Sequence, residues 1–206
     1  MASPTVSEHR QYLEERFSIR AWFGKSRYAQ TPIRGFAVET LHLSGWKQHK
    51  VWRETSPTGV GLILRQHDNV LEQIMAINVW ECTDVEAAHE YLVGALMQVQ
   101  STAVERDRMT EIGDVLFRLN DTFFVFARAN VVVLVRNIGS HVLGIEELAN
   151  ALDLAILRRL ALGPQATLQG PIPVPGPAAA PVAQGPDEPA AEPAPTVSAQ
   201  KGSARD

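Results

Sequence analysis

Cysteine is almost absent from this sequence of 206 residues, because Cys82 is its only example. A single cysteine excludes an internal disulfide and agrees with a reducing compartment. Long apolar runs are missing as well, since no stretch reaches the roughly 20 residues that a bilayer-spanning helix needs. The N-terminus also lacks the apolar core of a secretory signal. We therefore expect a cytoplasmic protein, although a chain whose signal had been removed would have the same composition.

Sequence signatures of catalysis and metal binding are missing too. The chain contains no HExxH, GxSxG or CxxC motif and no glycine-rich phosphate loop. His42 and His49 could share one face of a hairpin, but zinc needs a third or fourth ligand and the neighbouring Lys47 repels a cation. Cys82 lies just before a helix N-terminus, with Asp84 and His89 nearby in the sequence, which would suit a reactive thiol. A lone cysteine is nevertheless most often a small core residue. We predict no catalytic residue, no metal and no cofactor.

Charge of one sign is not in excess. The formal net charge is −4 at pH 7, and outside the C-terminal tail 17 basic residues face 19 acidic ones. A domain that binds nucleic acid usually carries a basic face, so we predict no nucleic-acid partner. Basic residues concentrate near the N-terminus, beside Trp22 and Phe23. Residues 8–27 could rest on an anionic membrane surface, but docking of these aromatic rings against the domain is the preferred interpretation.

Proline marks the domain boundaries, because ten of the 13 prolines lie after Gly163. Residues 163–206 contain few large apolar side chains and no periodicity, so they cannot offset the entropy cost of ordering the backbone. We predict a disordered Pro/Ala-rich tail there, acting as a spacer or tether. The rest divides into residues 1–35, an N-terminal amphipathic helix and loop, and residues 36–162, an α+β domain.

Two segments of this domain resemble each other. LILRQHDN begins at Leu62 and VLFRLNDT begins at Val115, and each precedes a β-rich apolar run and an amphipathic helix. The offset places Arg65 over Arg118. Self-similarity of this kind is typical of a duplicated supersecondary unit. We therefore predict two related units, each made of hairpins closed by a helix, over residues 36–100 and 112–162.

Polarity patterns and turn residues predict the individual elements. The predicted strands cover residues 36–43, 46–55, 60–65, 70–82, 114–119, 122–128 and 131–137. The predicted helices cover residues 6–23, the segment after a capping box at Thr83–Glu86, and residues 145–160, with a polar loop at 100–112. These elements predict an α+β fold: an antiparallel sheet of about seven strands with the helices packed on one face.

The second unit has enough turn signals for a predicted register. If Asn120-Asp121 and Ala129-Asn130 form two-residue turns, Leu119 pairs with Thr122 and Arg128 pairs with Val131. One face of this meander is then a core face. The other face is also apolar and carries Leu116, Phe123, Val125, Val132 and Leu134. Because a water-exposed antiparallel face is mostly polar, something must cover it: the N-terminal hairpin or helix, a second subunit, or a ligand.

The same register places Arg118, Phe123 and Arg136 in one row across the end of that second face. Guanidinium groups on either side of an aromatic ring suit an anion or a planar ligand. The two arginines could equally cover the apolar face with their aliphatic stems and pair with acids. The row is the strongest candidate ligand site in the sequence.

The apolar second face, together with the missing catalytic motifs, predicts a non-catalytic interaction or assembly module. It would bind itself or another protein through an interface formed by Leu116, Val125, Val132 and Leu134. The alternative is a small anionic-ligand-binding or enzymatic domain, with a pocket lined by Arg118, Phe123 and Arg136.

Overall fold

The computed structural model describes residues 6–28, 32–36, 46–66, 73–99, 101–141 and 144–162. Within these residues, seven strands form one antiparallel sheet in the order β1-β2-β3-β7-β6-β5-β4. The strands are β1 (Trp46–Thr55), β2 (Thr58–Gln66), β3 (Ile74–Glu81), β4 (Glu105–Asp107), β5 (Val115–Leu119), β6 (Phe123–Arg128) and β7 (Val131–Asn137). The predicted α+β class with a seven-stranded antiparallel sheet is confirmed.

The membership of the sheet differs from the prediction in two places. The predicted strand 36–43, its hairpin turn and the predicted tail at 163–206 lie outside the described residues, apart from Phe36. The second difference is β4, a strand that was not predicted and that lies within the segment predicted as a polar loop. Its sequence, Glu-Arg-Asp, carries no apolar alternation, and it pairs only with β5 at the edge of the sheet. An edge strand of three charged residues leaves no periodic signal.

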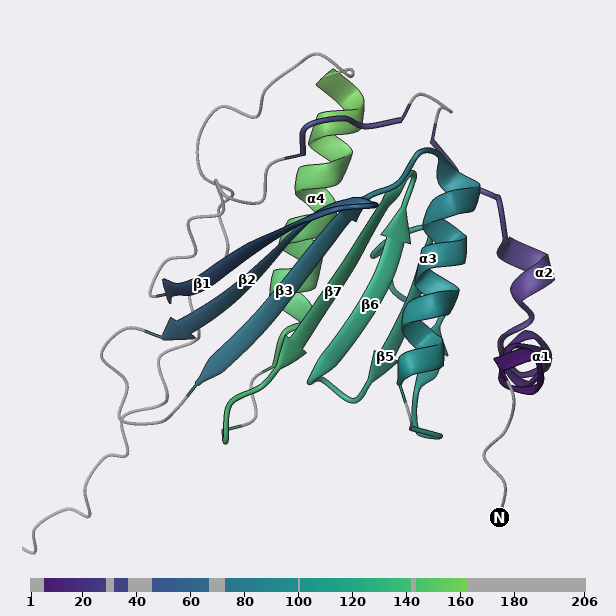
Figure 1. Ribbon diagram of the computed structural model, residues 1–206, viewed down its shortest axis with the longest axis horizontal. Coiled ribbons are helices and arrows are strands. Elements are labelled where there is room, and N and C mark those ends of the chain that lie inside the picture. Colours follow the sequence, from purple (N-terminus) through teal and green to yellow (C-terminus); the bar gives the residue numbers. More distant parts are fainter. Residues whose placement is uncertain are drawn as a thin grey trace, which may run out of the picture.

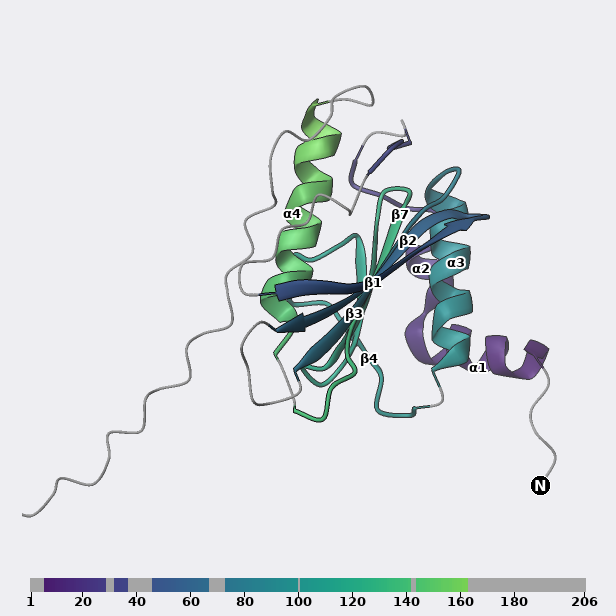
Figure 2. The same cartoon turned by 60° about the vertical axis from the view of Figure 1, so that its left-hand side comes forward.

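In the described part of the chain, four helices cover the sheet on both faces: α1 (Val6–Phe17), α2 (Ile19–Trp22), α3 (Val85–Gln98) and α4 (Glu146–Leu162). Helices α1, α2 and α3 lie on one side and α4 lies on the other (Figures 1 and 2). Each side has its own cluster of buried apolar residues. The predicted placement of all helices on one face was therefore wrong. Both faces of the central strands are apolar, so each needs a helical cover.

The predicted register was right at one turn and wrong at the other. Arg128 pairs with Val131 as predicted. Leu119, however, pairs with Phe123 instead of Thr122, because Asn120 takes a left-handed conformation at φ 49° and begins a three-residue loop. Since side chains alternate along a strand, this shift of one residue turns β5 over.

Each half of the sheet is a meander followed by a helix. Strands β1 to β3 precede α3, strands β5 to β7 precede α4, and the halves join through β3 and β7. The residue alignment used to predict this arrangement is not reproduced. Arg65 belongs to the second strand of the first meander, whereas Arg118 belongs to the first strand of the second.

Two helix boundaries also differ from the prediction. The helix predicted over residues 6–23 is broken at Ser18, which has a φ of 51° and separates α1 from α2. Helix α3 is capped by Asp84 and not by Thr83. The Asp84 carboxylate accepts a hydrogen bond from the backbone N–H of Ala87 at 2.8 Å. That hydrogen bond lowers the pKa of Asp84.

Hydrogen bonds connect the N-terminal segment to the rest of the domain. The side-chain oxygen of buried Asn130 accepts a hydrogen bond from the backbone N–H of Ile33 at 2.7 Å. Its side-chain nitrogen donates to the carbonyl oxygens of Ile33 and Cys82. Glu81 accepts hydrogen bonds from the backbone of Gly35 and Phe36. The described residues of the segment 1–35 thus share their core with the rest of the domain.

Trp22 belongs to this N-terminal segment and is buried against the domain, with 6% of the residue exposed. Its indole N–H donates to the carbonyl of Phe17, and its ring lies 5.8 Å from the ring of Phe117. In this conformation the indole is docked on the domain and is not presented to a membrane surface. Within the described residues, no helix combines the length and the apolar character needed to cross a bilayer.

Candidate functional site

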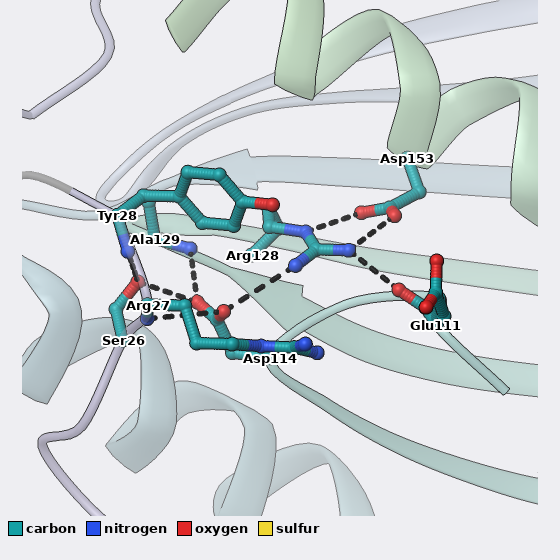
Figure 3. A network of polar contacts seen from close by, with 8 residues as sticks. All are labelled: Ser26, Arg27, Tyr28, Glu111, Asp114, Arg128, Ala129 and Asp153. Atoms are coloured by element: carbon teal, nitrogen blue, oxygen red, sulfur yellow. Dashed lines mark hydrogen bonds and ion pairs between the residues drawn. The ribbon is translucent and has the colours of Figure 1, made fainter. Parts of the chain in front are cut away.

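The densest cluster of buried charge surrounds Arg128, which is 2% exposed (Figure 3). Its guanidinium donates to the Asp153 carboxylate, with the Nε–Oδ1 distance at 2.8 Å, and to the carbonyl of Glu111 at 2.6 Å. Asp114 lies 3.4 Å away on a third side, and the ring of Tyr28 lies 5.1 Å from the guanidinium carbon. The cluster joins β6 to α4 and to the N-terminal segment.

Asp114 completes this cluster by holding two further groups. Its carboxylate accepts a hydrogen bond from the hydroxyl of Ser26 at 2.6 Å and another from the backbone N–H of Ala129 at 2.9 Å. All three charged side chains, Arg128, Asp114 and Asp153, are at least 96% buried. Because they satisfy one another and are enclosed, we assign the cluster a structural role.

An open groove of about 590 Å³ lies between α3 and the sheet. Helix α3 contributes Ala87, Glu90, Tyr91, Gly94, Ala95 and Gln98. The sheet contributes Trp80, Phe123, Leu134 and Arg136. These sheet residues come from three neighbouring strands, β3, β7 and β6. The groove therefore lies on the face that the sequence marked as unexpectedly apolar, at an end that the described residues leave open.

Aromatic rings form one wall of the groove. The rings of Trp80 and Tyr91 lie 4.9 Å apart, and the indole N–H of Trp80 donates to Glu54 at 2.7 Å. Trp80 lies directly over Gly59, where an added Cβ would come within 2.5 Å of the indole. Burial, and secondarily the charge of Glu54, raises the pKa of Tyr91 to about 12. Its phenol therefore stays protonated and available as a hydrogen-bond donor.

Gly94 opens the middle of the groove. It lies inside α3, where glycine normally weakens a helix. A Cβ built on Gly94 would meet no atom within 4 Å beyond the helix itself and its chain neighbours. The glycine therefore does not serve close packing between α3 and the sheet. Its effect is to leave space between the two walls.

Of the two charged side chains that line the described part of the groove, Glu90 is paired and Arg136 is exposed. Glu90 forms a two-pronged ion pair with Arg10 of α1, with one N–O distance at 2.8 Å. This pairing lowers the pKa of Glu90. Arg136 is exposed and faces Phe123 across the β6–β7 pair. Among the described residues, the lining thus combines an apolar body with one exposed guanidinium that forms no ion pair, and it holds no pair of groups suited to acid–base catalysis.

The structure brings together only part of the predicted ligand row. Phe123 and Arg136 are direct neighbours in the groove. Arg118 pairs with Phe124 and points to the other face of the sheet, where its Nε lies 3.2 Å from Asp107. The predicted row of three was wrong because the loop at Asn120 has three residues instead of two.

The residues predicted as an interface are mostly covered by the chain itself. Val125 and Val132 are fully buried beneath the helices on the α3 side. Leu116 is on the opposite face, 1% exposed, in the cluster beneath α4. Leu134 alone stays half-buried and lines the groove. Internal cover, one of the three alternatives for this face, accounts for most of it.

Sequence reasoning missed Trp80 and Tyr91 as groove residues. The available signal was a pair of glycines in the interior of a strand, because such glycines often mark the close approach of another group. Gly59 lies under Trp80, and Gly61 lies under Trp52, whose ring atoms come within 2.0 Å of a Cβ built there. Both contacts depend on strand pairing and so required the register of β1, β2 and β3.

A second hollow, of about 630 Å³, lies at the start of α4. Its lining includes Glu111, Asp121, Glu146 and Glu147. The described residues contain no group of three or more histidine, cysteine or acidic side chains arranged to hold a metal ion. Acidic residues near a helix start are otherwise explained by the helix dipole, so we give this hollow no role.

Cys82 is expected to resist alkylation in the folded protein. The side chain is 4% exposed, and burial, followed by the charge of Asp84, raises the pKa of its thiol to about 11. The thiolate, which is the nucleophile, is therefore scarce at neutral pH. Intact-mass measurement after iodoacetamide treatment should find the native protein unmodified and the urea-unfolded protein fully labelled. Equal labelling rates in the two states would contradict this assignment.

Comparison with protein-family models, with curated proteins and with solved structures gave no match, so the function of this groove is argued from its geometry and chemistry alone.

Proposed function

We propose that this protein is a non-catalytic interaction module that holds an apolar segment of another protein in the groove between α3 and the sheet. One observation supports this most directly: an open volume of about 590 Å³ is bordered by Trp80, Tyr91, Phe123 and Leu134. Exposed apolar grooves of this kind mark binding surfaces, and aromatic residues dominate binding energy at such surfaces.

The groove replaces the interface that the sequence suggested. Val125 and Val132 are fully buried, so an assembly surface on this face is restricted to its open end. The bound segment can come from a different protein or from a second copy of this chain. In either case the apolar side chains of the segment would fill the space that Gly94 leaves open.

A small anionic ligand is the second candidate occupant of the same groove. Arg136 beside Phe123 favours it, because a guanidinium next to an aromatic ring suits a carboxylate attached to an apolar body. The volume also falls within the range of about 300–1,000 Å³ that is typical of small-molecule sites.

Two further proposals accompany the function. A cytoplasmic location is supported by the single buried thiol, which fits a reducing compartment. A tethering role for residues 163–206 is supported by their Pro/Ala-rich composition.

Gly94→Ala is expected to raise the free energy of unfolding by about 1 kcal/mol, because alanine restores helix propensity at a position where its methyl group meets no neighbour. Urea unfolding followed by circular dichroism measures the change. Loss of stability would mean that the position is more crowded than its surroundings indicate.

Gly94→Leu tests the binding role without weakening the fold. Its side chain would project into the groove from a helix that the substitution strengthens. The probes are dodecanoate and fluorescein-labelled amphipathic peptides of about 18 residues, five helical turns, with leucine on one face. The leading proposal expects a peptide to bind wild type and Gly94→Ala, and to lose affinity for Gly94→Leu by at least about tenfold.

The two candidates differ in what the same titrations reveal. Binding of dodecanoate without any peptide, together with its loss in Arg136→Gln, would favour the small-ligand function. Peptide binding that Gly94→Leu leaves unchanged would place the site elsewhere. Binding of neither probe to the wild-type protein would count against both.

A further inference from the structure

Four exposed basic residues of the described strands lie on the same face of the sheet as the groove. The register pairs Arg136 of β7 with Ala76 of β3, and Ala76 with Ile63 of β2. Ile63 in turn pairs with Lys50 of β1. Partners in an antiparallel pair share a face, so Arg136 and Lys50 mark the two ends of one row.

The next row of the same face adds two more basic residues. Arg65 of β2 pairs with Lys47 of β1 on one side and with Ile74 of β3 on the other. Arg65 lies two residues along its strand from Ile63 and therefore points to the same side. We call Lys47, Lys50, Arg65 and Arg136 the basic band. All four are exposed.

Apolar and aromatic side chains lie directly beside the basic band. Trp52 covers Gly61 on the β1–β2 pair, and Trp80 covers Gly59 one step further along. Trp52 and Ile63 are half-buried. Together with the groove, these residues extend an apolar surface across the sheet from α3 to β1.

No acid of the described residues neutralises the basic band. The band forms no ion pair with any residue in the part of the chain that the structure describes. Two carboxylates on this side have partners outside the band. Glu54 receives the indole N–H of Trp80, and Glu90 pairs with Arg10. The positive field of the band is therefore directed at whatever occupies the surface.

Protection of the sheet edge explains only half of the basic band. Lysines on an edge strand discourage pairing with another chain, and Lys47 and Lys50 belong to the edge strand β1. Arg65 and Arg136 belong to interior strands, where no edge needs protection. Their position beside the groove calls for a different explanation.

We infer that the partner segment is acidic: it carries carboxylates along one side of an apolar stripe, so that the stripe fills the groove while the carboxylates meet the basic band. This inference rests on the proposed function and specifies the chemistry of the partner. Complementary charge supplies selectivity and faster association, while the apolar contacts supply most of the affinity.

The test uses the full-length chain and two labelled peptides of about 18 residues with the same leucine stripe. One peptide has glutamate and the other has lysine at the remaining positions. Fluorescence anisotropy is measured at about 0.05 M and about 0.5 M salt, where the screening length differs severalfold. A labelled oligo(dT) strand serves as an anionic probe without an apolar stripe.

Two triple variants separate the basic band from net charge. The first combines Lys47→Glu, Lys50→Glu and Arg65→Glu. The matched control combines Arg20→Glu, Arg108→Glu and Arg158→Glu, three exposed residues that do not line the groove. Both variants change the net charge of the protein equally.

The expected result is that wild type binds the glutamate peptide at least about tenfold more tightly than the lysine peptide at low salt, with a smaller ratio at high salt. The band variant should lose this preference and the control variant should retain it. Equal affinities for both peptides would overturn the inference while leaving the groove function intact. Tighter binding of oligo(dT) than of the glutamate peptide would overturn it in favour of a nucleic-acid surface. Binding of neither peptide would overturn it together with the proposed function.

Discussion

Asp153→Ala is expected to lower the free energy of unfolding by about 3–5 kcal/mol, because it removes the main ion-pair partner of a buried cation. Arg128 is 2% exposed and directs both its Nε and one terminal nitrogen at Asp153. Burial alone would lower the pKa of Arg128, but the hydrogen bond and the charge of Asp153 outweigh it and raise the pKa. Without Asp153 the guanidinium keeps its charge and retains the 3.4 Å contact to Asp114, the carbonyl of Glu111 and the ring of Tyr28.

The measurement is urea unfolding of wild type, Asp153→Ala and the triple variant Arg128→Met, Asp153→Leu and Asp114→Asn. The triple variant removes all three buried charges of the cluster, so its loss should be clearly smaller than that of the single variant. The amide oxygen introduced by Asp114→Asn can still accept hydrogen bonds from Ser26 and from the backbone N–H of Ala129. A single-variant loss below about 1 kcal/mol would show that Asp114 alone neutralises Arg128.

Acidification is expected to destabilise the protein through His89. This side chain is fully buried, and its Nδ1 accepts a hydrogen bond from the backbone N–H of Gly24 at 2.9 Å. Burial lowers the pKa of His89 from 6.5 to about 4, partly opposed by the charge of Asp114. The neutral form is therefore favoured in the folded state, and the unfolded state takes up the proton first as the pH falls.

The window and size of the effect follow from these two pKa values. The contribution of His89 to stability is fully present above pH 6.5 and is lost between pH 6.5 and about 4. The loss amounts to about 3 kcal/mol over that window, at about 1.4 kcal/mol for each pKa unit. Below about pH 4, protonation of folded His89 adds nothing further.

His89→Asn isolates this effect, because its amide oxygen can accept the Gly24 hydrogen bond and does not titrate. Urea unfolding is measured from pH 7 to 4. The free energy of unfolding should fall more steeply with decreasing pH in wild type than in the variant, because unfolding of wild type takes up as much as one additional proton. His49→Asn, at an exposed histidine on β1, controls for removal of a histidine as such. Parallel pH profiles for wild type and His89→Asn would contradict the assignment.

The periodic elements of the fold could be predicted from local sequence patterns. Helix α4 begins and ends within two residues of the predicted range 145–160, because its apolar stripe and its flanks are local signals. The turn at Ala129-Asn130 was predicted for the same reason. The three-residue loop after Leu119 was not, since asparagine and aspartate suit both turn lengths.

Distant contacts decided which way β5 faces. Phe117 is fully buried, and its ring lies 4.8 Å from the ring of Phe17 in α1. The opposite register would move Phe117 to the α4 side and place Arg118 under the N-terminal helices. Burying a charge there without a partner would cost several kcal/mol, so packing across 100 positions of sequence selected the loop length.

Only part of the candidate site could be predicted from the sequence. Phe123 and Arg136 were predicted as neighbours because the turn between β6 and β7 is local. Trp80, Tyr91 and Gly94 line the same groove, but they join it through pairing of β3 with β7 and packing of α3 on the sheet. No local pattern carries that information.

The sequence by itself determined the α+β class, the antiparallel sheet and the limits of helix α4, because polarity period and turn chemistry act over a few residues. Only the tertiary structure decided the cover of both faces, the orientation of β5 and the groove with its basic band. Those features depend on contacts such as the hydrogen bonds between Ile33 and Asn130, 97 positions apart. Such contacts form only when the whole chain buries its apolar surface together.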